Sequence, residues 1–528
     1  MSDTVIAHRG MVTSPHHLAS EAGLGVLQDG GNALEAAVAM AATLAVVYPH
    51  MTSIGGDSFW LIAEPSGEVY GIDACGAAAR ASNLELYTKA GHAAVPWRGP
   101  LAANTVAGTL SGWEMALGAG KGSLSLSRLL RDAIWHAANG VPVAAGGSEI
   151  AARKDAELRD VHGYAEVFRP GGKPLEVGAI LRQPALAATL RHIAEHGLRD
   201  AYEGKLGVSI AADLARAGSP VTAEDLRTHR AQRCAPLSAT VREAQLFNMP
   251  PPTQGVTSLL ILALFDRLEA AEANSFDHVH GLVEATKIAF RNARCSILGD
   301  PTYMPTDPQA LLSDARALDL LAAEISPRTA RPWPEPTQAG DTTWFGAIDS
   351  EGRVVSAIQS TYFEFGSGIV LPETGIIWQN RGAGFMLTED GWNALRPGRK
   401  PFHTLNPAIA KFPDGRVMAY GTMGGEGQPQ TQAAIFTRYA RYGVPLGEAV
   451  AAPRWLLGRT WGDESVTLKL EDRFDPSLYG ALRAAGHEVE ILPPFASTMG
   501  HAGGLVRHES GMTEGAGDPR SDGGVAAW

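Results

Sequence analysis

The sequence predicts a layered α/β sandwich organised around one large core. Of the 528 residues, 45% are apolar and 19% are charged, a composition that fits a folded chain and not a disordered one. Helical patterns dominate residues 100–330, and strand patterns begin at residue 342. Helices followed by strands, and then by mixed short elements, fit stacked layers better than a repeated strand–helix array.

The first part of the chain predicts two helices and a hairpin. Ser14 and Pro15 have the pattern of a helix cap followed by a first turn. Asn32 is expected to cap a second helix that is apolar on nearly every face up to Val47 and should therefore be buried all round. The other clear elements are strands at 58–63 and 69–74 and helices at 184–196 and 276–294.

A change of pattern occurs near residue 341. Residues 330–341 hold three prolines, which predicts an exposed and irregular segment. Strands are expected at 342–349 and 353–363, joined by an Asp-Ser-Glu-Gly turn. If the turn pairs Asp349 with Gly352, Thr342 lies opposite Gln359 and one step from Ser360, with a register error of about one residue left open.

Charge and cysteine content exclude several classes of protein. The net charge of −12 argues against nucleic acid and against a membrane surface as partner. The three cysteines form no CxxC pair, so neither a disulfide framework nor a structural zinc site is expected. The longest apolar run, 36–47, is shorter than the roughly 20 residues of a spanning helix. No signal-peptide pattern occurs in residues 1–20, and a cytoplasmic location is expected.

Motifs for cofactors and metals are weak. No phosphate-binding loop of the Gly-Lys-Ser/Thr type occurs. The run from His192 through Glu195 to His196 matches an inverted zincin spelling, but so short a match is common, and an exposed amphipathic helix is the favoured interpretation. Cys75 has no neighbour in the sequence that would lower the pKa of its thiol, and a small buried residue is the simpler interpretation. We therefore expect no metal and no cofactor.

Several short motifs occur in the order found in the gamma-glutamyltranspeptidase family, which the chain resembles nearly end to end. Each motif alone is weak, and the ordered set carries the resemblance. In chain order they are Gly30-Gly31-Asn32-Ala33, Gly55-Gly56-Asp57-Ser58-Phe59, Leu298-Gly299-Asp300-Pro301, Asp341-Thr342-Thr343, Phe365-Gly366-Ser367-Gly368-Ile369, Gly424-Gly425, Ala452-Pro453-Arg454-Trp455 and Asp518-Pro519-Arg520.

The resemblance implies an N-terminal nucleophile hydrolase with a four-layer αββα sandwich. It implies self-cleavage between Asp341 and Thr342, giving a large subunit of residues 1–341 and a small subunit of residues 342–528 that share one core. The chemistry explains the need for a cut, because a threonine hydroxyl requires a base and an amide nitrogen cannot accept a proton. Cleavage turns that nitrogen into an α-amine, which has a pKa near 7.7–8.0 and can accept the proton of the hydroxyl. Without the family context, Thr342 would be an ordinary strand residue.

The resemblance also implies the remaining catalytic groups. The hydroxyl of Ser360 is expected to contact the nucleophile; the alternative is a polar strand residue that faces solvent. Gly424 and Gly425 are expected to form the oxyanion hole, where two backbone N–H groups stabilise the charge of the tetrahedral intermediate. A simple turn is the alternative for these two glycines.

The groups that would hold a gamma-glutamyl substrate are replaced. A family Arg corresponds to Cys75, and the family Asp that pairs the substrate ammonium corresponds to Gly384. The other replacements are Tyr362 for Asn, Arg381 for Gln, and His403 and Thr404 for two serines. The stretch 385–401 is also shorter than the lid-bearing loop of the family, which puts transpeptidation in doubt.

Arg381 is the most informative replacement, since a guanidinium suits a carboxylate. The surrounding motifs resemble the branch of the family that contains oxamate amidohydrolase, so oxamate, a small amide that carries a carboxylate, is the substrate expected. A surface ion pair remains the alternative for Arg381, and packing roles remain alternatives for Tyr362 and His403.

Three other functions stay open. They are a gamma-glutamyl (glutathione) hydrolase or transpeptidase, a cephalosporin-type acylase, and a non-catalytic, unprocessed binding protein. The expected partners are a small-molecule amide and the two subunits of one precursor, and a dimer of heterodimers is an open assembly.

Overall fold

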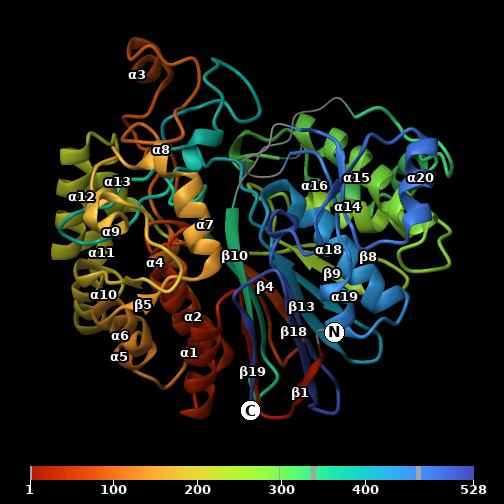
Figure 1. Cartoon of the computed structure of the whole chain (residues 1–528), viewed down its shortest axis with the longest axis horizontal. Coiled ribbons are helices and arrows are strands. Elements are labelled where there is room, and N and C mark those ends of the chain that lie inside the picture. Colours follow the sequence, from red (N-terminus) through yellow and green to blue (C-terminus); the bar gives the residue numbers. More distant parts are fainter. Residues whose placement is uncertain (1–2, 297, 334–340, 460–464) are drawn as a thin grey trace.

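The computed structural model describes residues 3–296, 298–333, 341–459 and 465–528; the side chains of residues 294–296 and of Asp341 are not among those described. Strands fill the centre of the molecule and helices cover both sides (Figure 1). Within the described residues, no helix is long and apolar enough to cross a membrane. Most of the Pro-rich stretch expected at 330–341 lies outside the described residues, at 334–340.

Two seven-stranded sheets, antiparallel throughout, form the two inner layers. The first sheet has the order β19 (Gly524–Ala527), β2 (Met11–Ser14), β10 (Asp341–Ile348), β11 (Val354–Tyr362), β3 (Asp57–Ala63), β4 (Val69–Ala74), β7 (Gln232–Cys234). The second has the order β1 (Val5–Ala7), β18 (Thr513–Gly517), β17 (Ala502–Arg507), β13 (Val417–Thr422), β12 (Ala408–Lys411), β9 (Gln245–Asn248), β8 (Leu237–Thr240).

Residues alternate between the two faces of each strand, as strand geometry requires. In β10, Trp344 and Ile348 join the apolar cluster between the sheets, whereas Phe345 and Ala347 join the cluster under the outer helices. The sheets therefore pack face to face, and the αββα sandwich expected from the sequence is confirmed.

The outer layers come from different parts of the chain. On the first sheet lie α1 (His17–Gln28), α2 (Ala33–Val47) and the following helices; on the second lie α14 (Gly255–Phe265), α15 (Phe276–Ser296) and α18 (Gln428–Phe436) (Figure 1). The remaining helices are α3 (Leu84–Lys89), α4 (Thr109–Gly120), α5 (Leu126–Leu129), α6 (Arg131–Asn139), α7 (Ala145–Arg153), α8 (Asp155–Leu158), α9 (Tyr164–Phe168), α10 (Pro184–His196), α11 (Asp200–Glu203), α12 (Lys205–Ala217), α13 (Ala223–Thr228), α16 (Pro308–Ser313), α17 (Ala315–Ala322), α19 (Leu446–Ala451) and α20 (Pro476–Ala485). Smaller sheets comprise β5 (Val141–Pro142) with β6 (Ile180–Leu181), and β14 (Trp455–Leu457), β15 (Leu468–Glu471) and β16 (Val489–Leu492).

The helix expected from Asn32 to Val47 is confirmed. Asn32 accepts from the backbone of Leu34 and Glu35, and Glu35 accepts from the Asn32 N–H, which completes a capping box. All fifteen residues of α2 are buried. The cap expected for the first helix is wrong: Ser14 belongs to β2, and the side chain of His16 caps α1.

The register expected for the hairpin of β10 and β11 is wrong by one residue. Asp349 pairs with Arg353 and not with Gly352, because the turn holds three residues and ends on Gly352 at φ +94°. Thr343, and not Thr342, therefore lies opposite Gln359.

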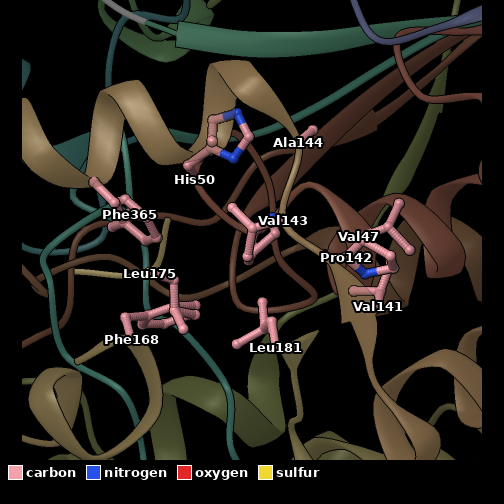
Figure 2. A pocket seen from close by; sticks show the side chains of 13 residues that line it. Val47, His50, Val141, Pro142, Val143, Ala144, Phe168, Leu175, Leu181 and Phe365 are labelled. Atoms are coloured by element: carbon pink, nitrogen blue, oxygen red, sulfur yellow. The ribbon is translucent and has the colours of Figure 1, made fainter. Parts of the chain in front are cut away.

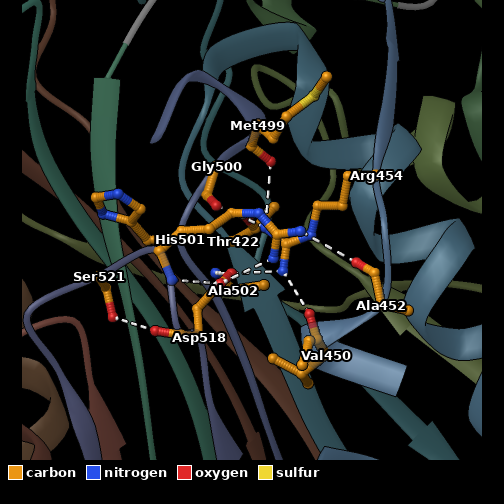
Figure 3. A network of polar contacts seen from close by, with 12 residues as sticks. Thr422, Val450, Ala452, Arg454, Met499, Gly500, His501, Ala502, Asp518 and Ser521 are labelled. Atoms are coloured by element: carbon orange, nitrogen blue, oxygen red, sulfur yellow. Dashed lines mark hydrogen bonds and ion pairs between the residues drawn. The ribbon is translucent and has the colours of Figure 1, made fainter. Parts of the chain in front are cut away.

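A buried ionic network braces the loops at one end of the second sheet (Figure 3). Asp518 accepts from the backbone of Ala502 at 2.6 Å and pairs with Arg454 at 2.5 Å and with Arg520 at 3.1 Å. Burial opposes the ionisation of Asp518, but the two guanidinium groups hold its pKa below the usual range. Arg454 also donates to the carbonyls of Met499 and Gly500 and so fixes that loop.

Substituting Asp518→Asn should lower the free energy of unfolding by about 3–5 kcal/mol, because the buried Arg454 loses its counter-charge while Arg520 keeps its pair with Glu471. Asp390→Asn is the matched control: its carboxylate pairs with Arg396 on the surface and is 93% exposed, so its effect should stay within about 1 kcal/mol. Urea denaturation of both variants measures the difference. Equal effects would contradict a structural role for the network.

Candidate active site

One apolar cavity lies among the outer helices (Figure 2). Its wall includes Val47, Val143, Phe168 and Phe365, and the only ionisable side chain of its described lining is that of His50. Burial lowers the pKa of His50 to about 3, so the ring is neutral. The described lining offers no nucleophile and no carboxylate partner, and we place the chemistry elsewhere.

Thr342 lies near the start of β10 and is 1% exposed. Trp344, two residues further along the same strand, packs against Gly421 near the end of β13 in the opposite sheet. The start of β10 therefore meets the turn that follows β13, at the seam between the two sheets. The side chain of Asp341, which precedes the expected cut, lies outside the described residues.

A β-bulge brings Ser360 next to Thr342. Asp341 pairs with Tyr362 and Thr343 with Gln359, so Ser360 and Thr361 together oppose Thr342. The hydroxyl of Ser360 accepts from the Tyr362 N–H at 2.7 Å. On the other side of β11 the backbone of Gly56 comes so close that a Cβ there would lie 2.1 Å from the Ser360 carbonyl oxygen. The packing thus fixes Ser360 beside the nucleophile position.

The Gly424–Gly425 turn follows β13 and has a left-handed backbone, with φ of +118° and +55°. The carbonyl of Gly424 accepts from Gly427 at 2.8 Å, and that of Gly425 accepts from Gln428 N–H and from Gln254 Nε2 at 2.7 Å. Neither glycine N–H has an acceptor among the described residues. Two free donors on a fixed turn are what an oxyanion hole requires.

Gln428 contacts Thr342 directly. Its Nε2 lies 3.3 Å from Thr342 Oγ1, and its Oε1 accepts from the Asn406 N–H at 3.3 Å. The side chain is fully buried. This contact joins the turn after β13 to the start of β10.

Arg381 is a buried cation that has no carboxylate partner among the described side chains. It is 1% exposed, stacks on the Tyr362 ring with its Cζ 3.4 Å from the ring centre, and donates to Thr404 Oγ1 at 3.3 Å. Its Nε and Nη2 have no partner in the described part of the chain. Burial lowers its pKa, an effect that Tyr362, Cys75 and Asp57 partly offset. Unpaired buried donors are costly, and an anion beside Arg381 would remove that cost.

Tyr362 itself has a strained backbone, with φ of +83° in a residue that is not glycine. Burial raises the pKa of its hydroxyl; Arg381 opposes this shift and buried Glu426 adds to it. The strain turns the ring under the guanidinium of Arg381.

Asp57 and His403 form a buried pair next to Arg381. His403 Nε2 lies 2.9 Å from Asp57 Oδ2, while Asp57 Oδ1 accepts from the backbone of Gly76 and Gly108 and from Gln379. Burial raises the pKa of Asp57 to about 6 and, with the Arg381 charge, lowers that of His403 well below its usual value. His403 is thus a neutral ring that donates through Nε2, and its Nδ1 has no partner among the described residues.

Cys75 joins this cluster as a neutral thiol, since burial and the neighbouring Asp57 and Asp73 raise its pKa well above the ordinary value. Its small side chain stands where the family resemblance places an arginine. Gly384, at the end of the short helix that begins at Arg381, offers no carboxylate for an ammonium group.

The structure brings the expected residues together. Arg381 contacts both Tyr362 and Thr404, Gln254 Nε2 bridges the carbonyls of Thr404 and Gly425, and Gln428 reaches Thr342. Sequence reasoning missed the roles of Asp57, Gln254 and Gln428. Asp57 lies in a motif that the sequence displays, whereas no local signal marks the two glutamines.

The histidine pair of α10 is not part of a site. His192 and His196 stack on one helix face at 4.1 Å, as the spacing predicts, but His192 Nε2 contacts Asp200 Oδ2 at 2.7 Å. Within the described residues, the groups that could hold a metal ion are Asp57–Cys75–His403 and His280–Glu284–His487. The first set is hydrogen-bonded and lies beside Arg381, which disfavours a cation there.

Comparisons with known proteins agree with this geometry. The chain is 50% identical over 532 residues to the oxamate amidohydrolase proenzyme of Klebsiella pneumoniae, with all of both chains covered. It is 40% identical over 530 residues to a glutathione hydrolase-like proenzyme of Bacillus subtilis, covering 99% of each. The solved structure of a cephalosporin acylase from Bacillus halodurans matches with a TM-score of 0.92 at 31% identity, over 100% of this chain and 97% of that one.

The family model for gamma-glutamyltranspeptidase matches residues 19–528, which is nearly the whole chain. The resemblance carried by the short motifs is thereby confirmed. This chain belongs to the gamma-glutamyltranspeptidase family.

Proposed function

We propose that this chain is a self-processing threonine amidohydrolase that hydrolyses a small amide carrying a carboxylate, with oxamate as the first candidate. Thr342 is the nucleophile, and cleavage after Asp341 divides the chain into residues 1–341 and 342–528, which stay together. The names of the relatives at 50% and 31% identity, an oxamate amidohydrolase and a cephalosporin acylase, support amide hydrolysis as the reaction.

The guanidinium of Arg381 is the observation that carries the substrate class. Among the described residues its Nε and Nη2 have no hydrogen-bond partner, so this buried arginine offers two donors for one carboxylate. Asp57 already accepts from four groups, and Gly384 carries no side chain. A substrate with an anionic group and no ammonium therefore fits better than a gamma-glutamyl compound.

The reaction follows from the groups around Thr342. The free α-amine takes the proton of the hydroxyl, and Oγ1 attacks the amide carbon. The N–H groups of Gly424 and Gly425 hold the oxyanion while the C–N bond breaks and ammonia leaves with the proton from the amine. Water then attacks the ester carbon, the amine takes its proton, and release of the acid returns that proton to Oγ1.

His403 can orient the amide end of the substrate. Its Nδ1 is an acceptor because Asp57 holds the proton on Nε2. Arg381 would donate hydrogen bonds to the carboxylate end of oxamate. His403 Nδ1 would accept one from the amide N–H at the other end. This arrangement would also prevent the carboxylate from binding in place of the amide.

Thr342→Ala should yield an intact chain of 55.6 kDa without amidase activity. The unchanged protein should give pieces of about 36 and about 20 kDa, dividing 55.6 kDa in the proportion of 341 to 528 residues, the smaller beginning at Thr342. Denaturing mass spectrometry and an ammonia-release assay on oxamate check both points. An intact, fully active unchanged chain would contradict the mechanism, and an intact, inactive one would favour a binding protein.

Arg381→Met should lower kcat/KM for oxamate about 10²-fold, because a charge-assisted pair is lost. The neutral diamide oxamide should be affected far less, so the preference for oxamate over oxamide should collapse. Arg399→Met is the matched control, since this buried arginine donates only to carbonyls of Gly391, Trp392 and Ala394 and should leave the preference unchanged. An unchanged preference in Arg381→Met, or faster turnover of a gamma-glutamyl anilide, would contradict the substrate class.

Asp57→Asn should reverse the tautomer of His403, because the amide of Asn would donate to Nε2 and move the ring proton to Nδ1. We expect kcat/KM for oxamate to fall about 10-fold at pH 8, the cost of one misdirected hydrogen bond.

The pH profile gives a second readout. In the unchanged protein, log kcat/KM should fall more steeply than a slope of one over about one pH unit below pH 6, where Asp57 takes up a proton in addition to the α-amine and the rate drops by up to the same 10-fold. In Asp57→Asn only the slope of one from the amine should remain. The same slope in both proteins would argue against control of His403 by Asp57.

A further inference from the structure

The amide of Gln428 has two contacts: one with the backbone of Asn406 and the other with the side chain of Thr342. Gln428 is the first residue of α18, and its side chain is fully buried. The Asn406 N–H can only donate, so the atom that receives it at 3.3 Å must be the carbonyl oxygen Oε1. The NH₂ group therefore faces Thr342 Oγ1, at 3.3 Å.

The surroundings keep Gln428 in this orientation. The side chain of Asn406 donates to Ser258 Oγ at 2.6 Å, and the Asn406 carbonyl accepts from Gln432. Pro429 follows Gln428 in the first turn of the helix, and its ring restricts the backbone there. An amide that served packing alone would not need its donor side aimed at the nucleophile.

We propose that Gln428 is a catalytic residue that donates a hydrogen bond to Thr342 Oγ1 during formation and hydrolysis of the acyl-enzyme. This proposal rests on the proposed function in one respect only, namely that Thr342 is the nucleophile. It assigns a donor that is separate from the two glycine N–H groups, which face the substrate oxygen and not Oγ1.

The donor acts on both halves of the reaction without transferring a proton. In acylation it occupies one lone pair of Oγ1, which leaves the other lone pair for attack on the amide carbon and directs the O–H toward the α-amine. In deacylation the bond between the acyl carbon and Oγ1 breaks, and negative charge builds on Oγ1 until the amine returns its proton. A fixed N–H donor stabilises that charge. The 3.3 Å separation is long for such a bond, as catalytic contacts commonly are before substrate binds.

Two variants at this position separate donation from packing. Gln428→Leu removes the donor, and kcat for oxamate should fall roughly 10²-fold at every pH. Gln428→Glu keeps the shape and the Asn406 contact, but the ionised carboxylate would accept the Thr342 hydroxyl proton and compete with the amine. Burial should raise the pKa of this Glu, and its protonated form can donate again. Its kcat relative to the unchanged protein should therefore be highest at acid pH and fall as pH rises.

Gln430→Glu is the matched control. Gln430 is also buried in α18, but it contacts the backbone of Glu426 and Leu457. Per processed molecule it should keep the pH profile of the unchanged enzyme, even where thermal unfolding shows lower stability. The rates of self-cleavage, followed by mass spectrometry, provide a readout for variants that mature slowly.

The outcomes are distinct. A Gln428→Leu protein that folds, matures and turns over within about twofold of the unchanged rate would overturn the proposal. So would a Gln428→Glu profile that is parallel to that of Gln428→Leu at all pH values. Failure of the proposed function looks different, because Thr342→Ala would then keep its activity whatever Gln428 does.

Discussion

The pairing of β10 is the constraint on which the rest of the structure depends. Residues Thr343–Ile348 pair with β11, but only Gly346–Ile348 also pair with β2. The strand is therefore held on both edges in its second half and, among the described residues, on one edge at its start. A cut before Thr342 would cost the sheet only the pair between Asp341 and Tyr362. The position expected for the cut is thus one where the backbone can break while the sandwich persists.

Strands on either side of residue 341 are interleaved in both sheets. In the first sheet, β2 lies between β19 and β10, and β11 pairs with β3, beyond which lie β4 and β7; in the second, β1, β8 and β9 lie at the edges around β12, β13, β17 and β18. Some inner strands have one neighbour from before residue 341 and one from after it. Every other inner strand lies beside such a strand. Apolar burial between the sheets adds to this, since Trp344 packs against glycines of β13 and β17. Two polypeptides cut at this point would be expected to separate only on unfolding.

Local patterns were sufficient to predict the layers, the buried helix α2 and the hairpin that carries Thr342, because alternation and capping are properties of short segments. The register was missed by one residue, since a three-residue turn and a bulge opposite Thr342 depend on how β11 packs against Gly56. Asp57, Gln254 and Gln428 were missed for a related reason. Each acts through contacts with residues more than 80 positions away, such as His403, Gly425 and Thr342, and no spacing in the sequence records these contacts.

The charges around Thr342 bear on the substrate class that the proposed function assigns to this site. Thr342, the glycine turn, Gln428, Arg381 and His403 all lie after residue 341, at strand ends and turns around one seam. Cys75, before residue 341, leaves room and a neutral thiol where the family resemblance places an arginine, and Arg381 supplies the cation from the opposite side. The Asp57 carboxylate already accepts hydrogen bonds from four donors, one of which is His403 Nε2. Under the proposed function, a guanidinium at Arg381 and the lack of a side chain at Gly384 would favour a simple anion over an amino acid, while Thr342 and the glycine turn keep their places.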